Sequence, residues 1–454
     1  MSDNPQTPAG NRSARLTQGS IRKHLVEQTA PAVLGIAALM SVGIIDAYFI
    51  GRLGPEPLAA VAFIFPVTAA LSSLGVGIMA GIASVVSRAL GRGHDDLAHG
   101  LANLGFLIAV VIGLLIATPL FLMRNSLFQL MQAEDALLPL IDAYMTPFAL
   151  GFGALPAMMA VSGTLRAQGA AKRSAVILLV MAASNWVLDP ILIVGAFGFE
   201  GFGIAGAAYA TLASWVLSGI VGLALLQTTD LPLNFKAVRH CALRRDSYAI
   251  ARVAAPAAFS NSINPAGLSI LTALLASAGP AAVAGFGAGG RLQAFAVVPL
   301  LGLSGSIGPI VGQNWGADKY DRARSALYWG GGFCLLYGLA VAAIMVLFRD
   351  PIAALFTDDV EVRDTLARYV LISAWGYGFY GICIMVNGAL NAVDRAGLAL
   401  AQSLARIALV MVPIAWLARP LLGADAVYYG ELAANVAGAI LSIVLVRWVF
   451  RKAS

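Results

Sequence analysis

Long apolar runs, separated by short polar connections, dominate this 454-residue chain. A helix needs about 20 apolar residues to cross the hydrocarbon core of a bilayer. Six runs of that length precede a polar stretch and six follow it. They lie near 29–50, 57–86, 101–123, 137–163, 173–197 and 202–228, and then near 248–277, 281–311, 325–348, 364–390, 397–418 and 426–448. The sequence predicts an all-α membrane protein with twelve transmembrane helices in two pseudo-symmetric six-helix lobes.

Composition excludes a soluble fold. Hydrophobic residues make up 59% of the sequence and charged residues 11%, whereas soluble domains average about 45–50% and about 25%. A soluble domain of this length could not hide so much apolar surface, because its exterior must face water. No charge-rich segment is long enough to form a separate soluble domain, so we expect no appended enzyme.

The two halves of the chain match each other at a fixed offset. Pro31 and Pro256 lie 225 residues apart, and so do the Gly-Pro pairs that begin at Gly54 and Gly279. Pro and Gly mark helix starts and turns, so these matches are more informative than matches of Ala or Leu. Each half holds an even number of spans, so both copies insert in the same orientation. We expect a symmetry axis along the membrane normal, between the two lobes.

The distribution of basic residues predicts the topology. Of the 29 Lys and Arg residues, 21 fall on the side of the N-terminus, including Arg88 and Arg166 in predicted loops, and six fall on the other side. Arg291 and Arg406 lie inside apolar runs. Cytoplasmic loops carry the excess of Lys and Arg, so we expect both termini to be cytoplasmic. The predicted parts are a cytoplasmic N-terminal segment (1–28), an N-lobe (29–228), a cytoplasmic linker (229–247), a C-lobe (248–449) and a C-terminal tail (450–454).

Two aspartates lie inside predicted membrane spans. Asp46 is in the first run and Asp189 is in the fifth, where an acid costs about 2.5–3.5 kcal/mol at the helix centre. Asn185 lies four residues before Asp189, on the same helical face, and Pro190 leaves the carbonyl of Trp186 without its usual donor. Such oxygens suit a hard cation, and the alternative is a polar cluster that packs helices together. We expect the two acids to titrate as a coupled pair.

The second half lacks these acids. Leu271 stands at the position that matches Asp46, and Ile414 at the one that matches Asp189. All four His residues fall outside the predicted spans, so a proton relay would need carboxylates. The dipeptide Asn264-Pro265 suggests a broken helix, with a packing kink as the alternative. The C-lobe keeps neutral polar residues instead, among them Asn261, Asn264, Gln313, Asn314, Asn387 and Gln402.

Other classes of protein lack their signatures in this sequence. Basic residues are scattered, without the continuous stripe expected for nucleic-acid binding. The three Cys residues have no zinc or redox spacing, and no Walker A loop is present for ATP hydrolysis. The glycine clusters at 285–290 and 330–332 lack a preceding strand, so we interpret them as helix-packing or kink positions. We therefore expect neither an enzyme nor a bound cofactor.

Five stretches of the chain, taken in order, resemble the multidrug and toxic compound extrusion (MATE) transporters. They are DAYFIGRLGPEPLAA (46–60), GTLRAQGAAK (163–172), NWVLDP (185–190), GAAYAT (206–211) and GPIVGQNWGA (308–317). The resemblance covers nearly the whole chain. It implies two six-helix lobes around a V-shaped cavity in a prokaryotic inner membrane.

The resemblance also implies a function. It predicts a secondary active exporter of amphipathic, often cationic drugs or metabolites, which works by cation antiport and alternating access. H⁺ is the favoured coupling ion and Na⁺ the alternative. The implied cation site in the N-lobe comprises Asp46, Asn185, Asp189, Thr211 and the carbonyl of Ala207. Na⁺ is the only metal ion expected, and it would bind at Asp46, Asn185 and Asp189. Two departures from the family stand out: Ser162 replaces an expected amide, and runs 251–277 and 369–387 contain no acid, which argues against Na⁺ binding in the C-lobe.

The substrate site is predicted by residue type alone. Its candidates are Met158, Met159, Asn261, Asn264, Phe286, Phe295 and Phe379. The expected partners are small-molecule substrates and membrane lipids, without nucleic acid, and we expect a monomer. The alternative function, a flippase for lipids or lipid-linked oligosaccharides, would need several cationic residues for pyrophosphate. Only Arg291 and Arg406 lie at membrane depth, which argues against it.

Overall fold

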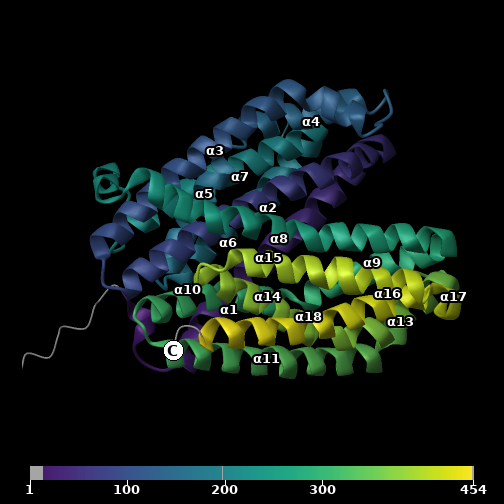
Figure 1. Ribbon diagram of the computed structural model, residues 1–454. Coiled ribbons are helices and arrows are strands. Elements are labelled where there is room, and N and C mark those ends of the chain that lie inside the picture. The colour runs from purple at the N-terminus through teal and green to yellow at the C-terminus, as the bar shows by residue number, and fades with distance from the viewer. Residues whose placement is uncertain (1–13, 197, 452–454) are drawn as a thin grey trace, which may run out of the picture.

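The chain folds into two helical lobes that converge at one end of the molecule and diverge at the other (Figure 1). The structure is a computed structural model and describes residues 14–196 and 198–451. Residues 1–13 of the predicted N-terminal segment and 452–454 of the predicted tail lie outside the described residues. The fold class expected from the sequence is confirmed.

The N-lobe is formed by the first seven α-helices. A 3₁₀ turn, η1 (Arg15–Thr17), precedes α1 (Ile21–Gly51). Helix α1 begins at Ile21, before the apolar run that was predicted to start near residue 29. The remaining elements are α2 (Pro55–Gly91), α3 (Asp95–Leu130), α4 (Leu138–Gly151), α5 (Ala154–Ala167), α6 (Ala171–Asp189), the π-helical turn η2 (Pro190–Val194), a small antiparallel hairpin of β1 (Gly195–Ala196) and β2 (Phe199–Glu200), and α7 (Ile204–Gln227).

A short connection with the 3₁₀ turn η3 (Phe235–His240) leads to the C-lobe. The C-lobe contains α8 (Leu243–Leu275), η4 (Ala276–Ala278), α9 (Pro280–Ala296), α10 (Val298–Gly316), α11 (Tyr320–Leu347), α12 (Arg349–Phe356), α13 (Val360–Ser373), η5 (Ala374–Gly376), α14 (Tyr377–Ala392), α15 (Ala396–Leu404), the π-helical turn η6 (Ala405–Met411), α16 (Val412–Leu417), α17 (Arg419–Leu422) and α18 (Asp425–Arg451). We call the end of the molecule that carries η3 the linker end.

Twelve membrane spans account for these helices apart from the short α12 and α17. In the described residues nine helices are long and apolar enough to cross a membrane, and two bent pairs, α4 with α5 and α9 with α10, raise this to eleven. Each pair bends by 47°. Helix α8 is the twelfth span, because its 33 residues exceed the required length although Asn261 and Asn264 make it more polar. It runs without interruption through Pro265, so the broken helix suggested by Asn264-Pro265 is wrong.

The repeat in the sequence corresponds to a repeat in local structure. Gly54 and Gly279 both have positive φ, 125° and 107°, and each is followed by a proline at the first position of a helix. A residue with a Cβ atom rarely adopts such φ values, and proline is suited to a helix start. The two Gly-Pro pairs therefore make the same turn at the start of the second span and of the eighth.

Small residues and buried polar contacts bring the lobes together. A Cβ atom on Gly77 of α2 would lie 2.5 Å from the carbonyl oxygen of Ala254 in α8, so the two helices cross almost in backbone contact. Near the linker end Arg88 Nη1 donates to the carbonyl of Ala392 (2.6 Å), and Gln313 Nε2 donates to the carbonyl of Ala167 (2.7 Å). These contacts close the linker end.

Helix α1 contacts both lobes. Near its start Leu25 belongs to the C-lobe core, and Gly302 of α10 packs against Val33. Further along, the indole of Trp186 in α6 donates to Ser41 Oγ (3.1 Å). Because α1 bridges the two lobes, a change in its packing alters how they sit together.

Candidate functional site

The two aspartates predicted from the sequence lie next to each other inside the N-lobe. Asp46 of α1 lies close to Asp189, the last residue of α6, so the two carboxyl groups influence each other electrostatically. Asp189 is completely buried and Asp46 is partly buried. Among the described residues, Asp46 Oδ1 and both carboxylate oxygens of Asp189 have no hydrogen-bond partner. No basic side chain in the described chain forms an ion pair with either acid. The fold thus gathers unsatisfied carboxylate oxygens at one point.

The other predicted members of the site also lie in this region. Asn185 is buried, and its Nδ2 donates to the carbonyl of Met181 (3.1 Å), which leaves its Oδ1 without a partner among the described residues. Ala207 of α7 is buried in a cluster with Ile50 and Ile193. Thr211, one turn further along α7, lies beside the hydroxyl of Tyr144.

Tyr144 of α4 belongs to this site, although the sequence analysis did not single it out. Its hydroxyl group lies near Asp46, Asp189 and Thr211. A tyrosine in an apolar run gives no signal of its own in the sequence, because aromatic side chains are common in membrane helices. Four helices, α1, α4, α6 and α7, therefore supply the site. We call Asp46, Tyr144, Asn185, Asp189 and Thr211 the acidic site.

The backbone at Asp189 is irregular. Helix α6 ends at this residue and continues as the π-helical turn η2, which begins at Pro190. Proline has no N–H to donate, and π-helical turns are frequent at functional sites. Asp189 therefore lies where the hydrogen-bond pattern of the helix changes.

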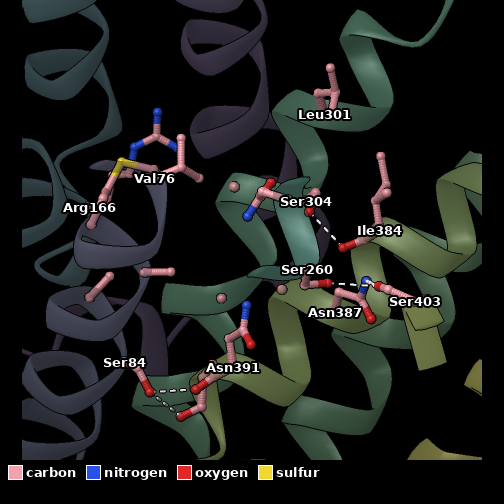
Figure 2. A pocket seen from close by; sticks show the side chains of 18 of the residues that line it. Val76, Ser84, Arg166, Ser260, Leu301, Ser304, Ile384, Asn387, Asn391 and Ser403 are labelled. Atoms are coloured by element: carbon pink, nitrogen blue, oxygen red, sulfur yellow. Dashed lines mark hydrogen bonds between the residues drawn. The ribbon is translucent and has the colours of Figure 1, made fainter. Parts of the chain in front are cut away.

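A separate cavity of about 330 Å³ lies between the two lobes. Figure 2 shows Arg166 on one wall, and Ser260, Asn387 and Ser403 on the opposite wall. We call it the central cavity. The polar residues that line it are Ser84, Arg166, Ser260, Asn261, Asn264, Ser304, Tyr380, Asn387, Asn391, Gln402, Ser403 and Arg406. No Asp or Glu is among the described residues that line it.

Three of the seven residues predicted for the substrate site line the central cavity. They are Met159, Asn261 and Asn264. Met158 is 1% exposed and its sulfur accepts a hydrogen bond from Ser218, so it faces the interior of the N-lobe instead. Helical geometry explains this difference, because neighbouring residues on a helix point about 100° apart.

The three phenylalanines predicted for the substrate site do not line the central cavity. Phe286 packs against Tyr369 and Tyr428 in the core of the C-lobe. Phe379 packs at the edge of the same core, and Phe295 is exposed on α9. These three positions were predicted from residue type alone. The direction in which each ring points depends on how its helix is rotated, and residue type does not determine that rotation.

Two arginines were assigned to loops by the sequence, and the structure buries both. Arg88 lies in the last turn of α2 and Arg166 in the last turn of α5, and each is 8% exposed. Arg166 lines the central cavity, whereas Arg291, which the sequence placed at membrane depth, is exposed on α9 and does not. The helices extend further than the apolar runs, which explains the wrong assignment.

A buried acid in the C-lobe was also missed. Glu431 of α18 is 3% exposed, and its Oε1 accepts a hydrogen bond from Gln293 Nε2 (2.6 Å). The signal was available, because Glu431 is the one acid within the last apolar run, 426–448. It does not line the central cavity.

Comparison with known proteins decides the family. The MatE family model matches residues 31–191 and 256–417, once in each lobe, and the two matches start 225 residues apart. The chain belongs to the MATE family. It is accordingly a membrane transporter and not an enzyme.

Several similar proteins are named as transporters or multidrug resistance proteins, and the match covers most of each chain. An FAD transporter of Shewanella oneidensis is 33% identical over 400 residues, which cover 88% of each chain. A probable multidrug resistance protein, YoeA of Bacillus subtilis, is 24% identical and covers 78% of each chain. The crystal structure of the MATE transporter VcmN from Vibrio cholerae in the bent form has a TM-score of 0.90 at 27% identity, covering 97% of this chain and 98% of that one.

Proposed function

We propose that this MATE transporter exports small organic molecules by cation antiport, with Asp46 and Asp189 as the coupling residues. The observation that supports the proposal is a pair of neighbouring carboxyl groups, inside a membrane domain, without a basic partner among the described residues. Burying a carboxylate without a counter-charge is costly, so such a pair favours binding a cation.

The oxygen atoms of the acidic site fit either H⁺ or Na⁺. Carboxylate, amide and hydroxyl oxygens are hard ligands, and Asn185 presents its oxygen because its nitrogen is already bonded to Met181. We propose H⁺ as the coupling ion and keep Na⁺ as the alternative. An ion that binds more tightly in one conformation than in the other shifts the equilibrium between them.

Helices α1 and α6 supply the physical link between ion and substrate. Leu39 of α1 lines the central cavity, and Asp46 follows about two turns later. Leu178 of α6 lines the same cavity, and Asn185 also follows about two turns later. Neutralising the acids changes the packing between these helices, so it also changes the cavity wall. Ion and substrate binding are then reciprocally coupled.

We also propose that the linker end faces the cytoplasm of a prokaryotic cell, in the inner membrane. The linker segment, the start of α1 and the end of α18 lie at this end (Figure 1). It also carries most of the Lys and Arg residues, which agrees with the positive-inside rule. In this orientation the closed end is cytoplasmic, and the lobes diverge toward the outside.

The charge of the cargo differs between the family resemblance and one of the similar proteins. The family resemblance suggested cationic compounds, and the relative named YoeA is a probable multidrug resistance protein. The Shewanella oneidensis relative is named an FAD transporter, and FAD is an anion. We therefore propose FAD and the cationic dye ethidium as the two test substrates for this chain.

Proteoliposomes that contain the full chain test the proposal. We expect an imposed pH gradient to drive transport of at least one of the two substrates, and a sodium gradient alone to drive little. Asp46→Asn and Asp189→Asn should each lower gradient-driven transport by at least about tenfold. Asp358→Asn, at an exposed position between α12 and α13, is the matched control and should transport normally. Gradient-driven transport that survives in both N-lobe variants would contradict the coupling role.

A further inference from the structure

Arg166 extends from the N-lobe into the central cavity. It is 8% exposed, and its Nε donates to Ser174 Oγ (3.0 Å), which in turn bonds to Ser162 Oγ (2.7 Å). These two serines fix the guanidinium plane from one side. The guanidinium passes over Gly305 of α10, where a Cβ atom would clash with Arg166 Nη1. Arg166 thus reaches across the cavity to α10 of the C-lobe.

Arg406 enters the same cavity from the C-lobe. It lies in the π-helical turn η6 and is 5% exposed. Its Nη1 donates to Asn435 Oδ1 (2.8 Å) and its Nη2 donates to Asn264 Oδ1 (2.5 Å), while its guanidinium lies 5.1 Å from the ring centre of Tyr380. Each of these contacts is made by a neutral group, so they orient the cation without neutralising it.

Neither arginine has an acidic partner in the described part of the chain. No carboxylate oxygen lies within 4.0 Å of either guanidinium. Glu431 is close enough to Arg406 to interact with it electrostatically, but it forms no ion pair and is hydrogen-bonded to Gln293. Buried Arg88 donates a hydrogen bond to Ser84, which lines the cavity, and so adds a third positive charge near it. Arginine keeps its charge even when buried.

Two buried guanidinium groups without an acidic partner in the described chain line one cavity, so a negatively charged ligand would be stabilised there. A buried charge is stabilised only when it is paired and hydrogen-bonded, and arginine matches phosphate in geometry through paired N–H donors. Ser260, Asn387 and Ser403 form a connected set of hydroxyl and amide groups on the C-lobe wall, which suits an oxygen-rich ligand. Leu39, Met79 and Leu178 supply apolar surface on the N-lobe wall.

We infer that the central cavity binds an amphipathic organic phosphate, held between Arg166 of the N-lobe and Arg406 of the C-lobe. The inference rests on the proposed export function and specifies the substrate class of its cavity. The volume of about 330 Å³ lies within the range of roughly 300–1,000 Å³ that is usual for small-molecule sites. Because one arginine comes from each lobe, a bound phosphate also bridges the two moving bodies.

Flavins provide matched probes for this site. FAD and FMN carry phosphate, riboflavin has the same ring system without phosphate, and ethidium is a cation of comparable aromatic character. We expect FAD and FMN to bind the purified full-length protein at least about tenfold more tightly than riboflavin, measured by flavin fluorescence and by the rise in Tm. Equal binding of FAD and riboflavin, or tighter binding of ethidium, would overturn the inference.

Arginine variants locate the phosphate site. Arg166→Gln and Arg406→Gln should each weaken FAD binding by about tenfold or more and leave riboflavin binding unchanged. Arg291→Gln is the matched control, because Arg291 is exposed and does not line the cavity. Arg166→Lys and Arg406→Lys keep the charge and should retain part of the affinity, so they test the site if a Gln variant fails to fold. Unchanged FAD binding in folded Gln or Lys variants contradicts the proposed clamp.

Transport separates this inference from the proposed function. If FAD binds in an arginine-dependent way but no ion gradient drives export of either FAD or ethidium, the antiport function fails and the phosphate site stands. If a pH gradient drives ethidium export while FAD is neither bound nor exported, the phosphate site fails and the antiport function stands.

Discussion

The two lobes share one helical plan but place their buried charged groups at different positions. The N-lobe holds Asp46 and Asp189 side by side without a basic partner among the described residues. At the matching positions the C-lobe has Leu271 and Ile414, and its buried cation, Arg406, is held by two asparagines. The backbone repeat therefore fixes where helices start and turn, whereas the charged groups are specific to each lobe. Structural symmetry in such a fold does not predict chemical symmetry.

This contrast suggests a division of labour. A cluster of unpaired acids suits a cation, and a cavity with unpaired arginines suits an anion. The two sites are separate, yet α1 and α6 contribute residues to both. Coupling between a cation and an anionic cargo then needs no direct contact between them, because both alter the packing of the same two helices.

The largest expected effect comes from copying the N-lobe acid into the C-lobe. Leu271 is completely buried in the C-lobe core, so Leu271→Asp would bury a carboxyl group without the polar neighbours that Asp46 has. We expect a loss of stability of about 3 kcal/mol or more. Thermal unfolding in detergent measures it, with Leu271→Met, which changes volume little, as the control. A tolerated Leu271→Asp would show that the lobes are chemically more alike than the structure indicates.

The second prediction compares the two buried acids with each other. Asp189→Asn should lower gradient-driven transport by at least about tenfold, equivalent to about 1.4 kcal/mol, because it removes an ion-coupling charge. Glu431→Gln should change transport by less than about twofold, because a glutamine still accepts the hydrogen bond from Gln293. Transport in proteoliposomes at fixed protein content measures both. Equal losses would mean that ion coupling is shared by the two lobes.

A third prediction concerns the surface where the lobes meet. Gly77→Ala would place a Cβ atom 2.5 Å from the carbonyl oxygen of Ala254, so we expect it to destabilise the protein by about 1 kcal/mol or more through overpacking. Gly219 of α7 has no atom near its Cβ position, so Gly219→Ala should be neutral or slightly stabilising. Parallel melting curves measure both. If the two variants behave alike, the close crossing of α2 and α8 is not required for the fold.

The smallest expected effect is that of Tyr144→Phe. This change removes the hydroxyl beside Asp46, Asp189 and Thr211 and keeps the ring. We expect the ion concentration for half-maximal transport to change by about two- to fivefold, the value of one hydrogen bond. The control is Tyr48→Phe, whose ring is 63% exposed on α1. An equal response in both variants would remove Tyr144 from the acidic site.

Much of the fold followed from local features of the sequence. The length of each apolar run predicted the spans, because a bilayer core sets a minimum helix length. The Gly-Pro pairs predicted the repeat, since both force the same turn. Asp46, Asn185 and Asp189 were recognisable because acids and amides are costly inside a membrane and therefore stand out in an apolar run.

Other features of the site gave no usable local signal. Arg166 was assigned to a loop because it lies at the end of its apolar run, yet α5 continues through it and buries it. Phe286 was expected in the cavity, yet its ring packs in the core of the C-lobe. Tyr144 approaches the acids only because α4 packs beside α7. Each of these outcomes depends on how a helix is rotated against its neighbours.

The sequence by itself determined that the chain spans a membrane, that it does so in two similar halves, and that the first half carries two acids inside its spans, Asp46 and Asp189, with no counterpart at the matching positions of the second. The cost of placing charge and unpaired backbone in hydrocarbon imposes these properties on each segment separately. Only the tertiary structure decided that two arginines from different lobes line one cavity and that no acid in the described part of the chain lines it with them. Cavity-facing and lipid-facing positions look alike in an apolar helix, and only packing between helices distinguishes them.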